Sequence, residues 1–451
     1  MGERTCDVAI IGAGTAGLKA YKAALERGAD AVIIERGPGG STCTRVGCMP
    51  SKLLIAAGRA AHQARQAALF GVIVGDVAVD AKQVWRRVQE QRDRFVASVL
   101  EDYNAIPADR VIHGQARFAG PDALVIGDDR IVATKGIVIA TGARPIIPEI
   151  LEPVRQLVRT HETIFDLDDL PARMAVLGAG PLGLELGQAF ARLGVAVTVI
   201  DKGDTVAGLK DPETNKAAIA ALADEVTIML GVDVFACIND KGSARLSTAG
   251  GDIDADLILA ATGRPPALDG LDLESTGLAL DDHGTPLFDS ATRRCGESRI
   301  FIAGDANAWR PVLHEAARGG RIAGGVAMGG PPAKPLPAVA IAFTEPNLVE
   351  VGQSFDALPG DALVGQATVT DNGRATIDGK DHGLVRLYAA PDGKLLGGSI
   401  TAPAGEHLGQ LLALAIEREM DVAALEDQAW YHPTEEELLQ AAARDLLGKM
   451  R

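Results

Sequence analysis

The stretch Gly12-Ala13-Gly14-Thr15-Ala16-Gly17 follows the apolar run 8–11, and it recurs later as Gly178-Ala179-Gly180-Pro181-Leu182-Gly183. After each stretch come a helix of small residues and a second apolar run, which ends in Glu35 in the first copy and Asp201 in the second. From first glycine to acid, 35 minus 12 and 201 minus 178 each give 23 residues. In such a unit the three glycines make a tight turn, admit a pyrophosphate and let helix and strand pack closely. Two dinucleotide-binding βαβ units are therefore predicted.

The helix after each glycine turn offers free N–H groups and the positive end of its dipole to phosphates. The acid about 20 residues later accepts a hydrogen bond from a ribose hydroxyl. In the second unit, Asp201 favours NAD over NADP, because a carboxylate repels a 2′-phosphate and Lys202 alone is close enough to offset that charge. The alternative is two strand–turn–helix units that bind no ligand.

Composition and charge limit the classes of partner. The chain has 451 residues, of which 47% are apolar and 52 are glycine, so several structural units are expected. A formal net charge of -16 argues against nucleic acid and anionic membrane surfaces as partners. No apolar run reaches about 18 residues, and the polar residues 1–7 do not resemble a secretory signal. A cytoplasmic location is predicted.

The five cysteines are too few and too scattered for a structural disulfide framework; they are Cys6, Cys43, Cys48, Cys237 and Cys295. Two of them, Cys43 and Cys48, lie five residues apart at the expected start of a helix, within the reach of a disulfide. A helix N-terminus lowers the pKa of a thiol, and the thiolate is the reactive form. Half a zinc site or two inert thiols are the alternatives, but no second ligand pair lies nearby.

The segment 40–52, GSTCTRVGCMPSK, resembles the class I pyridine nucleotide–disulfide oxidoreductases, which include dihydrolipoamide dehydrogenase, glutathione reductase and mercuric reductase. The resemblance covers nearly the whole chain in the order of the family. Its other anchors are the two glycine units, Gly304-Asp305 and His432-Pro433-Thr434 with Glu437. It implies FAD in the first unit, NAD in the second, and an enzyme.

The same resemblance implies an α/β fold with two Rossmann-like domains and a C-terminal α+β dimerisation domain. The expected boundaries are residues 1–150 for the FAD domain with its redox disulfide, 151–266 for the NAD domain, 267–336 for the continuation of the central domain, and 337–451 for the interface domain. A helical stretch is expected from about residue 51 to 99.

Roles for individual residues follow from the resemblance. Cys48 is the flavin-side thiol, Cys43 exchanges with the substrate, and Lys52 lies near the flavin and pairs with Glu185. The residues implied for FAD are Gly12, Gly14, Gly17, Glu35, Thr42, Thr141, Gly142, Gly304 and Asp305. The residues implied for NAD are Gly178, Gly180, Gly183, Asp201 and Gly263.

His432 is implied as the acid–base for the substrate thiol, supplied across a homodimer by the partner subunit, and Glu437 as the carboxylate that orients it. Thr434 to Glu437 also reads as an ordinary capping box, so Glu437 has a second interpretation. The family pattern predicts a cis bond between His432 and Pro433.

The expected reaction is oxidation of dihydrolipoamide by NAD+ through the Cys43–Cys48 disulfide and the flavin, with a separate lipoyl-bearing carrier protein as partner. Relatives that reduce mercuric ion carry a further cysteine pair near the C-terminus, whereas the last cysteine here is Cys295, so that activity is not expected. Pro181, Trp430 and Tyr431 bear on which substrate enters. The alternatives are an NAD(P)H-dependent reductase of another small-molecule or protein disulfide, and a flavin-binding protein without turnover.

Overall fold

The computed structural model describes residues 2–450, which form two compact units, each discontinuous in sequence and each described by itself below. The first unit comprises Met1–Pro50, Arg87–Ile146 and Gly263–Pro335. The second comprises Ser51–Arg86, Ile147–Thr262 and Leu336–Arg451. The finer division into four segments stays a prediction.

A seven-stranded sheet is the centre of the first unit. Its strand order is β3-β2-β1-β6-β5-β4, and β15 also pairs with β6. The strands are β1 (Glu3–Ile11), β2 (Ala31–Glu35), β3 (Val111–His113), β4 (Ala116–Phe118), β5 (Ala123–Ile126), β6 (Asp129–Ile139) and β15 (Ile300–Ile302). Strands β3, β2, β1, β6 and β15 run parallel, as a βαβ unit requires, while β4 and β5 are antiparallel additions.

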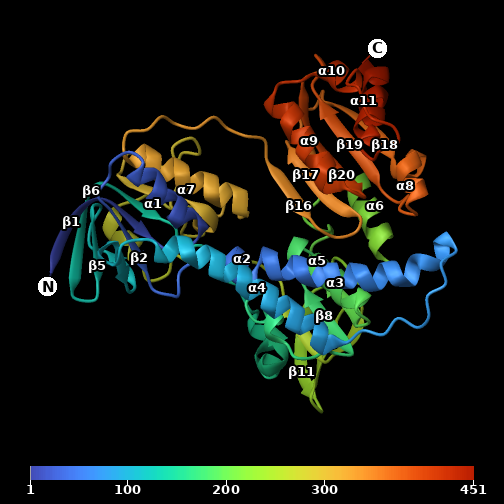
Figure 1. The fold of residues 1–451 in the computed structure, drawn as a ribbon, viewed down its shortest axis with the longest axis horizontal. Helices are drawn as coiled ribbons and strands as arrows, with labels where there is room; N and C mark the ends of the chain where they lie inside the picture. Colours follow the sequence, from blue (N-terminus) through green and yellow to red (C-terminus); the bar gives the residue numbers. More distant parts are fainter. Residues whose placement is uncertain (1, 451) are drawn as a thin grey trace. The chain divides into compact units, whose positions relative to one another are not determined.

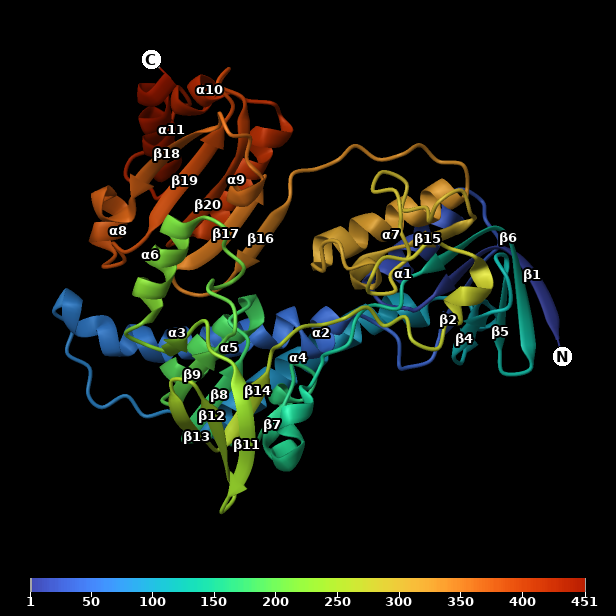
Figure 2. The ribbon, with the colours of Figure 1, turned by 180° about the vertical axis from the view of Figure 1, so that it is seen from behind.

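Two helices, α1 (Thr15–Leu25) and α7 (Leu313–Ala327), lie side by side in this unit (Figures 1 and 2). Glycine makes their contact possible, since a Cβ at Gly320 would lie 2.1 Å from Ala16 O and one at Gly324 would lie 2.1 Å from Ala20 O. The other long helices are α3 (Cys48–Gln66) and α4 (Ala81–Asn104). The predicted helical stretch from about 51 to 99 is thus helical in most of its length, but the irregular residues 72–80 divide it, which was not predicted.

A second parallel sheet lies in the second unit, in the order β10-β9-β8-β14-β7. Its strands are β7 (Val158–Arg159), β8 (Arg173–Leu177), β9 (Ala196–Ile200), β10 (Thr227–Met229) and β14 (Leu257–Ala260). Helices α5 (Pro181–Arg192) and α6 (Pro212–Leu222) belong to the same nucleotide unit. A separate antiparallel sheet is formed by β11 (Val234–Asp240), β12 (Ser243–Thr248) and β13 (Gly251–Ala255).

The C-terminal part of the second unit is an antiparallel sheet in the order β16-β17-β20-β19-β18. Its strands are β16 (Val339–Ala342), β17 (Asn347–Gly352), β18 (Leu363–Thr368), β19 (Leu384–Ala389) and β20 (Leu395–Ala402). Two helices, α9 (Gly405–Glu417) and α11 (Glu437–Met450), pack on it around one apolar core, together with α8 (Gly373–Ile377) and α10 (Val422–Glu426) nearby (Figure 2). The predicted fold class, two Rossmann-like units and a C-terminal α+β domain, is confirmed.

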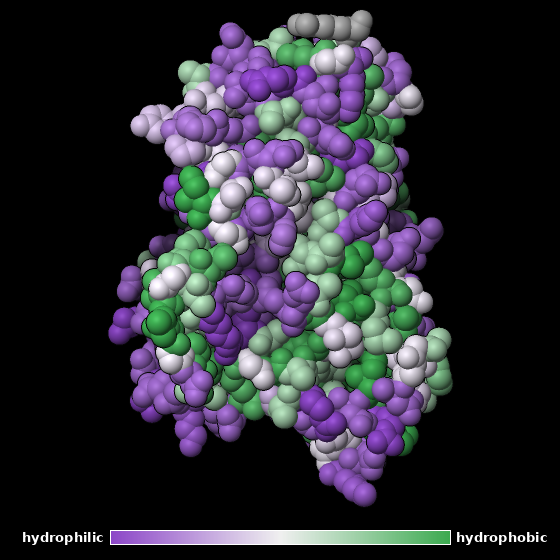
Figure 3. Space-filling view, turned by 90° about the vertical axis from the view of Figure 1, so that its right-hand side faces the viewer, coloured by the Kyte–Doolittle hydropathy of each residue, from purple (hydrophilic) through white to green (hydrophobic). Residues whose placement is uncertain are grey.

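The surface is polar with local apolar patches. Figure 3 shows one face, on which hydrophilic side chains predominate in the upper part and hydrophobic side chains gather in patches lower down. The exposed large apolar side chains after α3 form a strip in the second unit, made of Leu69, Phe70, Val72, Ile73 and Val74. No helix within residues 2–450 is long and apolar enough to cross a membrane.

A buried polar junction joins α6 to the C-terminal sheet. Asp211 caps α6 and is fully buried, and its carboxylate accepts a hydrogen bond of 2.8 Å from the Tyr388 hydroxyl. Glu350 on β17 accepts a hydrogen bond of 2.7 Å from Ser399 Oγ. Burial raises the pKa of Glu350 to about 7, and the hydrogen bonds from Ser399 and the Lys210 backbone only partly oppose this rise.

The Glu350→Gln substitution is expected to raise the stability of the protein, relative to the wild type, more at pH 8 than at pH 5. Because the folded-state pKa of Glu350 lies above its ordinary 4.5, the folded state favours the protonated carboxyl, and stability falls as pH rises from about 4.5 through 7. Gln removes this loss, which is of the order of 1–3 kcal/mol at pH 8. Thermal unfolding at both pH values measures it. The exposed-site variant Glu417→Gln is the control, and an equal difference for Glu350→Gln at both pH values would contradict the prediction.

Candidate functional site

The first glycine turn admits no side chain at two of its three glycines. Gly12 has a φ of +103°, and a Cβ there would lie 2.5 Å from Ala140 O. A Cβ at Gly17 would lie 1.8 Å from Gly12 O, so α1 can approach β1 only with glycine at this position. At Gly14, by contrast, a Cβ would meet no other atom of the described residues within 4 Å. The open side of the helix start is where a pyrophosphate can approach the backbone.

The second glycine turn repeats this geometry. Gly178 has a φ of +111°, and a Cβ there would lie 2.3 Å from Ala261 O. A Cβ at Gly183 would lie 2.0 Å from Gly178 O, whereas at Gly180 it would find open space among residues 2–450. Each of the three glycines is 166 residues after its counterpart, since 178 minus 12, 180 minus 14 and 183 minus 17 each give 166.

The two acids are held by matching backbone hydrogen bonds. Glu35 accepts from Ala13 N at 2.6 Å and from Gly37 N at 2.7 Å. Asp201 accepts from Ala179 N at 2.6 Å and from Gly203 N at 2.7 Å. Each carboxylate is thus fixed beside a glycine turn at the end of the second strand, the place from which it can reach a ribose hydroxyl.

Other atoms of the first unit fit the FAD implied by the sequence. The buried Thr141 hydroxyl has no hydrogen-bond partner among the described residues, as expected of a group that bonds a ligand. Gly304 has a φ of +72°, and a Cβ there would lie 2.9 Å from Ala16 Cβ. This close approach brings the next residue, Asp305, close to α1. Gly142 has a positive φ and open space at the Cβ position within the described part of the chain, and so does Gly263, which the resemblance assigns to NAD.

Arg264 is a site residue that sequence reasoning missed. Its Nη2 lies 3.0 Å from Asp305 Oδ2, and both side chains are largely buried. Arg264 lies between Gly263 and two prolines and belongs to none of the recognised motifs, so its position in the chain gives no sign of this contact. Arg264 therefore sets the charge around the carboxylate that the resemblance assigns to the flavin side chain.

The cysteine loop is built from a short helix, α2 (Thr42–Val46), and the start of α3. Ser41 caps α2 by accepting from Cys43 N at 3.2 Å, and its Oγ lies 2.8 Å from Thr15 Oγ1 on α1. The loop is thereby tied to the first glycine turn. Cys43 is half-buried, and Cys48 is exposed at the first residue of the 19-residue α3, where the helix dipole favours a thiolate.

The pair Cys43 and Cys48 differs from the other three cysteines in the glycine between them and in its exposure. A Cβ at Gly47 would lie 3.1 Å from Cys43 Cα, so the turn between the two thiols closes only around glycine. Burial raises the pKa of Cys6 to about 11, raises that of Cys295 to about 12, and raises that of Cys237 as well. These three thiols stay protonated at neutral pH, and a thiol is a poor nucleophile.

Lys52 and Glu185, paired in the sequence analysis, lie 2.7 Å apart in the second unit. Glu185 is the fifth residue of α5, directly after the first turn of that helix, and its side chain is almost fully buried. Lys52 is on α3, four residues after Cys48 and therefore one helical turn along from it.

His432 is an exposed imidazole held by a carboxylate. Its Nδ1 lies 3.0 Å from Glu437 Oε1 and 3.1 Å from Oε2, and the predicted cis bond to Pro433 is confirmed. Glu437 Oε2 also accepts from Thr434 N at 3.0 Å, so this residue both orients the imidazole and caps α11. The hydrogen bonds from His432 and then from Thr434 N lower the pKa of Glu437. Because the Glu437 carboxylate bonds Nδ1 of His432, the other ring nitrogen, Nε2, is available for proton transfer.

Comparison with known proteins identifies the family. Residues 6–320 match the family described as "Pyridine nucleotide-disulphide oxidoreductase", and residues 338–443 match the dimerisation domain of the same family. The mercuric reductase of Shigella flexneri is 34% identical over 97% of this chain and 80% of its own length. The dihydrolipoyl dehydrogenase of Halobacterium salinarum is 31% identical over 98% of this chain and 96% of its own.

Solved structures agree on the fold. The HOCl-induced flavoprotein disulfide reductase RclA from Escherichia coli superposes with a TM-score of 0.82, at 22% identity over 97% of this chain and 99% of that one. LpdA from Mycobacterium tuberculosis gives a TM-score of 0.84 at 24% identity, over 98% of this chain and 99% of its own.

The Gly180→Ala substitution is expected to leave folding intact and to weaken NADH binding by about tenfold or more, the equivalent of about 1.4 kcal/mol. Gly180 has a φ of -69°, which alanine adopts without strain, but the added methyl group would occupy the approach of the pyrophosphate. Gly183→Ala is the contrasting variant, because its Cβ would overlap Gly178 O and lower the melting temperature. NADH titration and thermal melting distinguish the two. Unchanged NADH affinity in Gly180→Ala would place the dinucleotide elsewhere.

Proposed function

Because the chain belongs to the pyridine nucleotide-disulphide oxidoreductase family, we propose that it is an FAD-dependent, NAD-linked dihydrolipoyl dehydrogenase. The reaction would be dihydrolipoamide + NAD+ to lipoamide + NADH + H+. The observation that carries the choice of substrate is the charge beside His432, where Glu435 and Glu436 are both partly exposed. A lipoyl group is neutral and tolerates these acids, whereas an anionic disulfide such as glutathione disulfide is repelled.

The choice of NAD rests on Asp201. Its carboxylate accepts from Ala179 N and Gly203 N, which directs it along the second glycine turn, where the adenosine ribose would lie. A 2′-phosphate at this place would be repelled by the Asp201 carboxylate. Lys202 is the one cation close by in the sequence, and it is exposed to solvent.

The cysteine pair would carry two electrons by thiol–disulfide exchange. A substrate thiolate attacks Cys43 Sγ, the Cys43–Cys48 bond breaks, and Cys48 leaves as a thiolate. The second substrate thiol, once deprotonated, attacks the substrate sulfur joined to Cys43; that bond breaks and Cys43 leaves as the lipoyl disulfide forms. The dithiol is thereby oxidised and the cysteine pair reduced. Thr141, Asp305 and the first glycine turn would hold FAD, which supplies the two-electron acceptor between the cysteine pair and NAD+.

His432 would accept the proton of the first attacking thiol at Nε2 and release it to solvent before it accepts the proton of the second, while Glu437 holds Nδ1 and stabilises the imidazolium each time. We propose that this imidazole serves the disulfide of a second copy of the chain. The match of residues 338–443 to a dimerisation domain supports a homodimer. The strip from Leu69 to Val74 supports it as well, because exposed apolar patches of this kind are usually covered by a partner.

Reduction of mercuric ion is the second candidate. The relatives support it, because mercuric reductases match this chain at 34% and 33% identity, as closely as the dihydrolipoyl dehydrogenases do. Cys43 and Cys48 could bind a soft metal ion as thiolates. The two candidates differ in substrate and in the direction of electron flow, so one assay separates them.

Purified enzyme is expected to reduce NAD+ with dihydrolipoamide and to reduce NADP+ only poorly. The assay follows NADH absorbance with lipoamide, glutathione disulfide, coenzyme A disulfide and mercuric ion, each with both nucleotides. The Cys43→Ser variant is the control, since it keeps the fold but lacks the sulfur that the substrate attacks. Turnover of mercuric ion but not of lipoamide would replace the proposal with the second candidate. A thiol titration that finds no new pair after NADH reduction would indicate a flavin protein without disulfide turnover.

Mixed dimers test the origin of His432. Chains with Cys48→Ser and chains with His432→Gln are each expected to be nearly inactive alone. When the two are co-expressed, about half of the dimers are hybrids with one complete site, so activity recovers to about a quarter of the wild-type value. If each subunit used its own His432, the hybrid would have no complete site, and no recovery would be seen.

A further inference from the structure

Helix α5 carries a buried polar face that the glycine motif does not explain. Glu185, Gln188 and Arg192 are spaced three and four residues apart, so they share one side of the helix. All three are buried, with exposed fractions of 6%, 4% and 6%. Buried polar groups are retained where partners satisfy them. Glu225 and Lys52 supply some of these partners, and the others lie in the segment 343–345, which follows β16.

This segment is docked on α5 through its backbone. Phe343 N donates to Glu185 Oε1 at 2.9 Å. Glu345 N donates to Gln188 Oε1 at 2.9 Å, and Gln188 Nε2 donates to Glu345 O at 2.8 Å. The amide of Gln188 thus pairs with both backbone groups of Glu345, as a neighbouring strand would. The segment therefore has one register on the helix.

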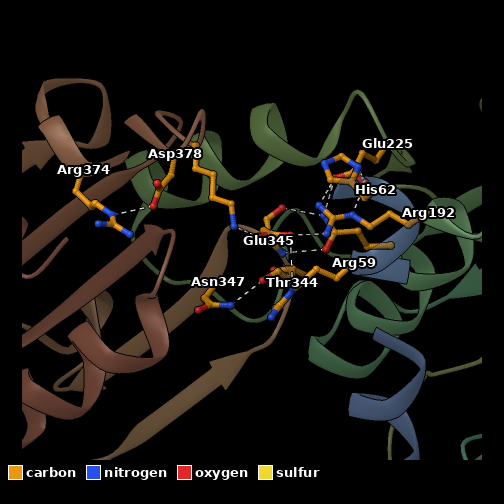
Figure 4. Close-up of polar contacts among 11 residues, drawn as sticks. Arg59, His62, Arg192, Glu225, Thr344, Glu345, Asn347, Arg374 and Asp378 are labelled. Atoms are coloured by element: carbon orange, nitrogen blue, oxygen red, sulfur yellow. Dashed lines mark hydrogen bonds and ion pairs between the residues drawn. The ribbon is translucent and has the colours of Figure 1, made fainter. Parts of the chain in front are cut away.

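The Glu345 side chain adds charge to the same contact. Its Oε2 lies 2.5 Å from Arg192 Nη1, and its Oε1 pairs with Lys380 (Figure 4). Burial raises the pKa of Glu345, but hydrogen bonds from Lys380 and Arg192 outweigh it and hold the pKa at about 2. Glu345 stays ionised at neutral pH, so the contact does not loosen in the physiological range.

The docked segment places an aromatic ring on the ammonium of Lys52. Lys52 Nζ lies 4.2 Å from the centroid of the Phe343 ring, within the range of a cation–π contact. The same Nζ is 2.7 Å from Glu185 Oε2, while Glu185 Oε1 holds Phe343 N. One carboxylate therefore fixes both the lysine and the residue that covers it. The Lys52 side chain keeps about a third of its surface exposed, at 34%.

We propose that Phe343 is a positioning residue that holds the Lys52 ammonium toward the flavin, and that Gln188 acts through Phe343 by fixing its backbone. The proposal rests on the proposed function: the resemblance makes Cys48 the flavin-side thiol, and Lys52 follows it by one turn of α3. A fixed positive charge near the flavin favours the reduced form, because negative charge develops on the ring system when it accepts electrons. Phe343 and Gln188 would then tune the reduction potential without touching substrate or cofactor.

The Phe343→Leu variant tests the ring. Leucine keeps apolar bulk but has no π face, so the ammonium is freed toward water and the flavin midpoint potential is expected to fall. Phe343→Tyr restores the ring and is expected to restore the wild-type potential. Gln188→Leu removes both bonds to Glu345 and is expected to shift the potential in the same direction but less, since Phe343 N keeps its bond to Glu185. Dye-coupled anaerobic reduction of the holoenzyme measures each potential.

A second measurement needs no flavin. The Phe343 ring covers one side of the Lys52 amine, so reductive methylation of Lys52 in the apoprotein is expected to be about fivefold faster in Phe343→Leu. This corresponds to about 1 kcal/mol at 1.36 kcal/mol per tenfold. Peptide mass spectrometry quantifies it. Phe355→Leu is the matched control, because it removes a ring that lies 5.7 Å from the Arg386 guanidinium in the same unit and is expected to change neither quantity.

Two results would overturn the proposal. One is a Phe343→Leu protein that melts like the wild type and keeps both its potential and its Lys52 labelling rate. The other is a potential shift from Phe343→Leu that persists in a Lys52→Met background, since the ring would then act on something other than the ammonium. If lipoamide fails as substrate while the shifts appear, the proposed function falls and this inference stands. If lipoamide is turned over and the shifts are absent, the reverse holds.

Discussion

The contact between a helix and the strand before it, at Gly17 and at Gly183, is the constraint on which both nucleotide units depend. Neither glycine has room for a methyl group, because the carbonyl of the first glycine in its turn lies about 2 Å from the Cβ position. If either helix moved outward, its N-terminus would separate from the acid that is fixed on the turn. In the first unit the same displacement would carry Thr15 away from Ser41 and so disturb the cysteine loop.

Helix α5 contributes both to the second glycine turn and to the support of the C-terminal sheet. Its first turn forms part of a dinucleotide site, and its buried face holds both Lys52 and the segment after β16. A Cβ at Gly58 of α3 would lie 2.9 Å from Ala189 O, so α3 also packs directly on this helix. Nucleotide, lysine and C-terminal sheet therefore share one rigid support, and a change at one is felt at the others through α5.

Local patterns account for what the sequence could predict. The glycines, the acids and the cis bond at Pro433 all belong to short motifs at fixed spacing, whose geometry is set mainly by neighbours in the chain. The pair of Lys52 and Glu185 spans 133 residues and was predicted only through the family resemblance. Gln188, Arg192 and Glu345 belong to no such motif, and polar residues on a helix usually face water. Their burial arises from elements about 150 residues away, for which one sequence carries no signal. The irregular residues 72–80 were missed because strong helix formers flank them on both sides.

The second unit is assembled from three separate pieces of chain, and this has a consequence for biosynthesis. Arg192 reaches Glu345 across 153 residues. At roughly 5–20 residues per second, the ribosome needs about 8–30 s to synthesise that interval. During this time the buried face of α5 has no docking segment, so Arg192 has Glu225 as its partner but not Glu345. Release of the last hundred residues completes this contact, so the unit matures only near the end of translation.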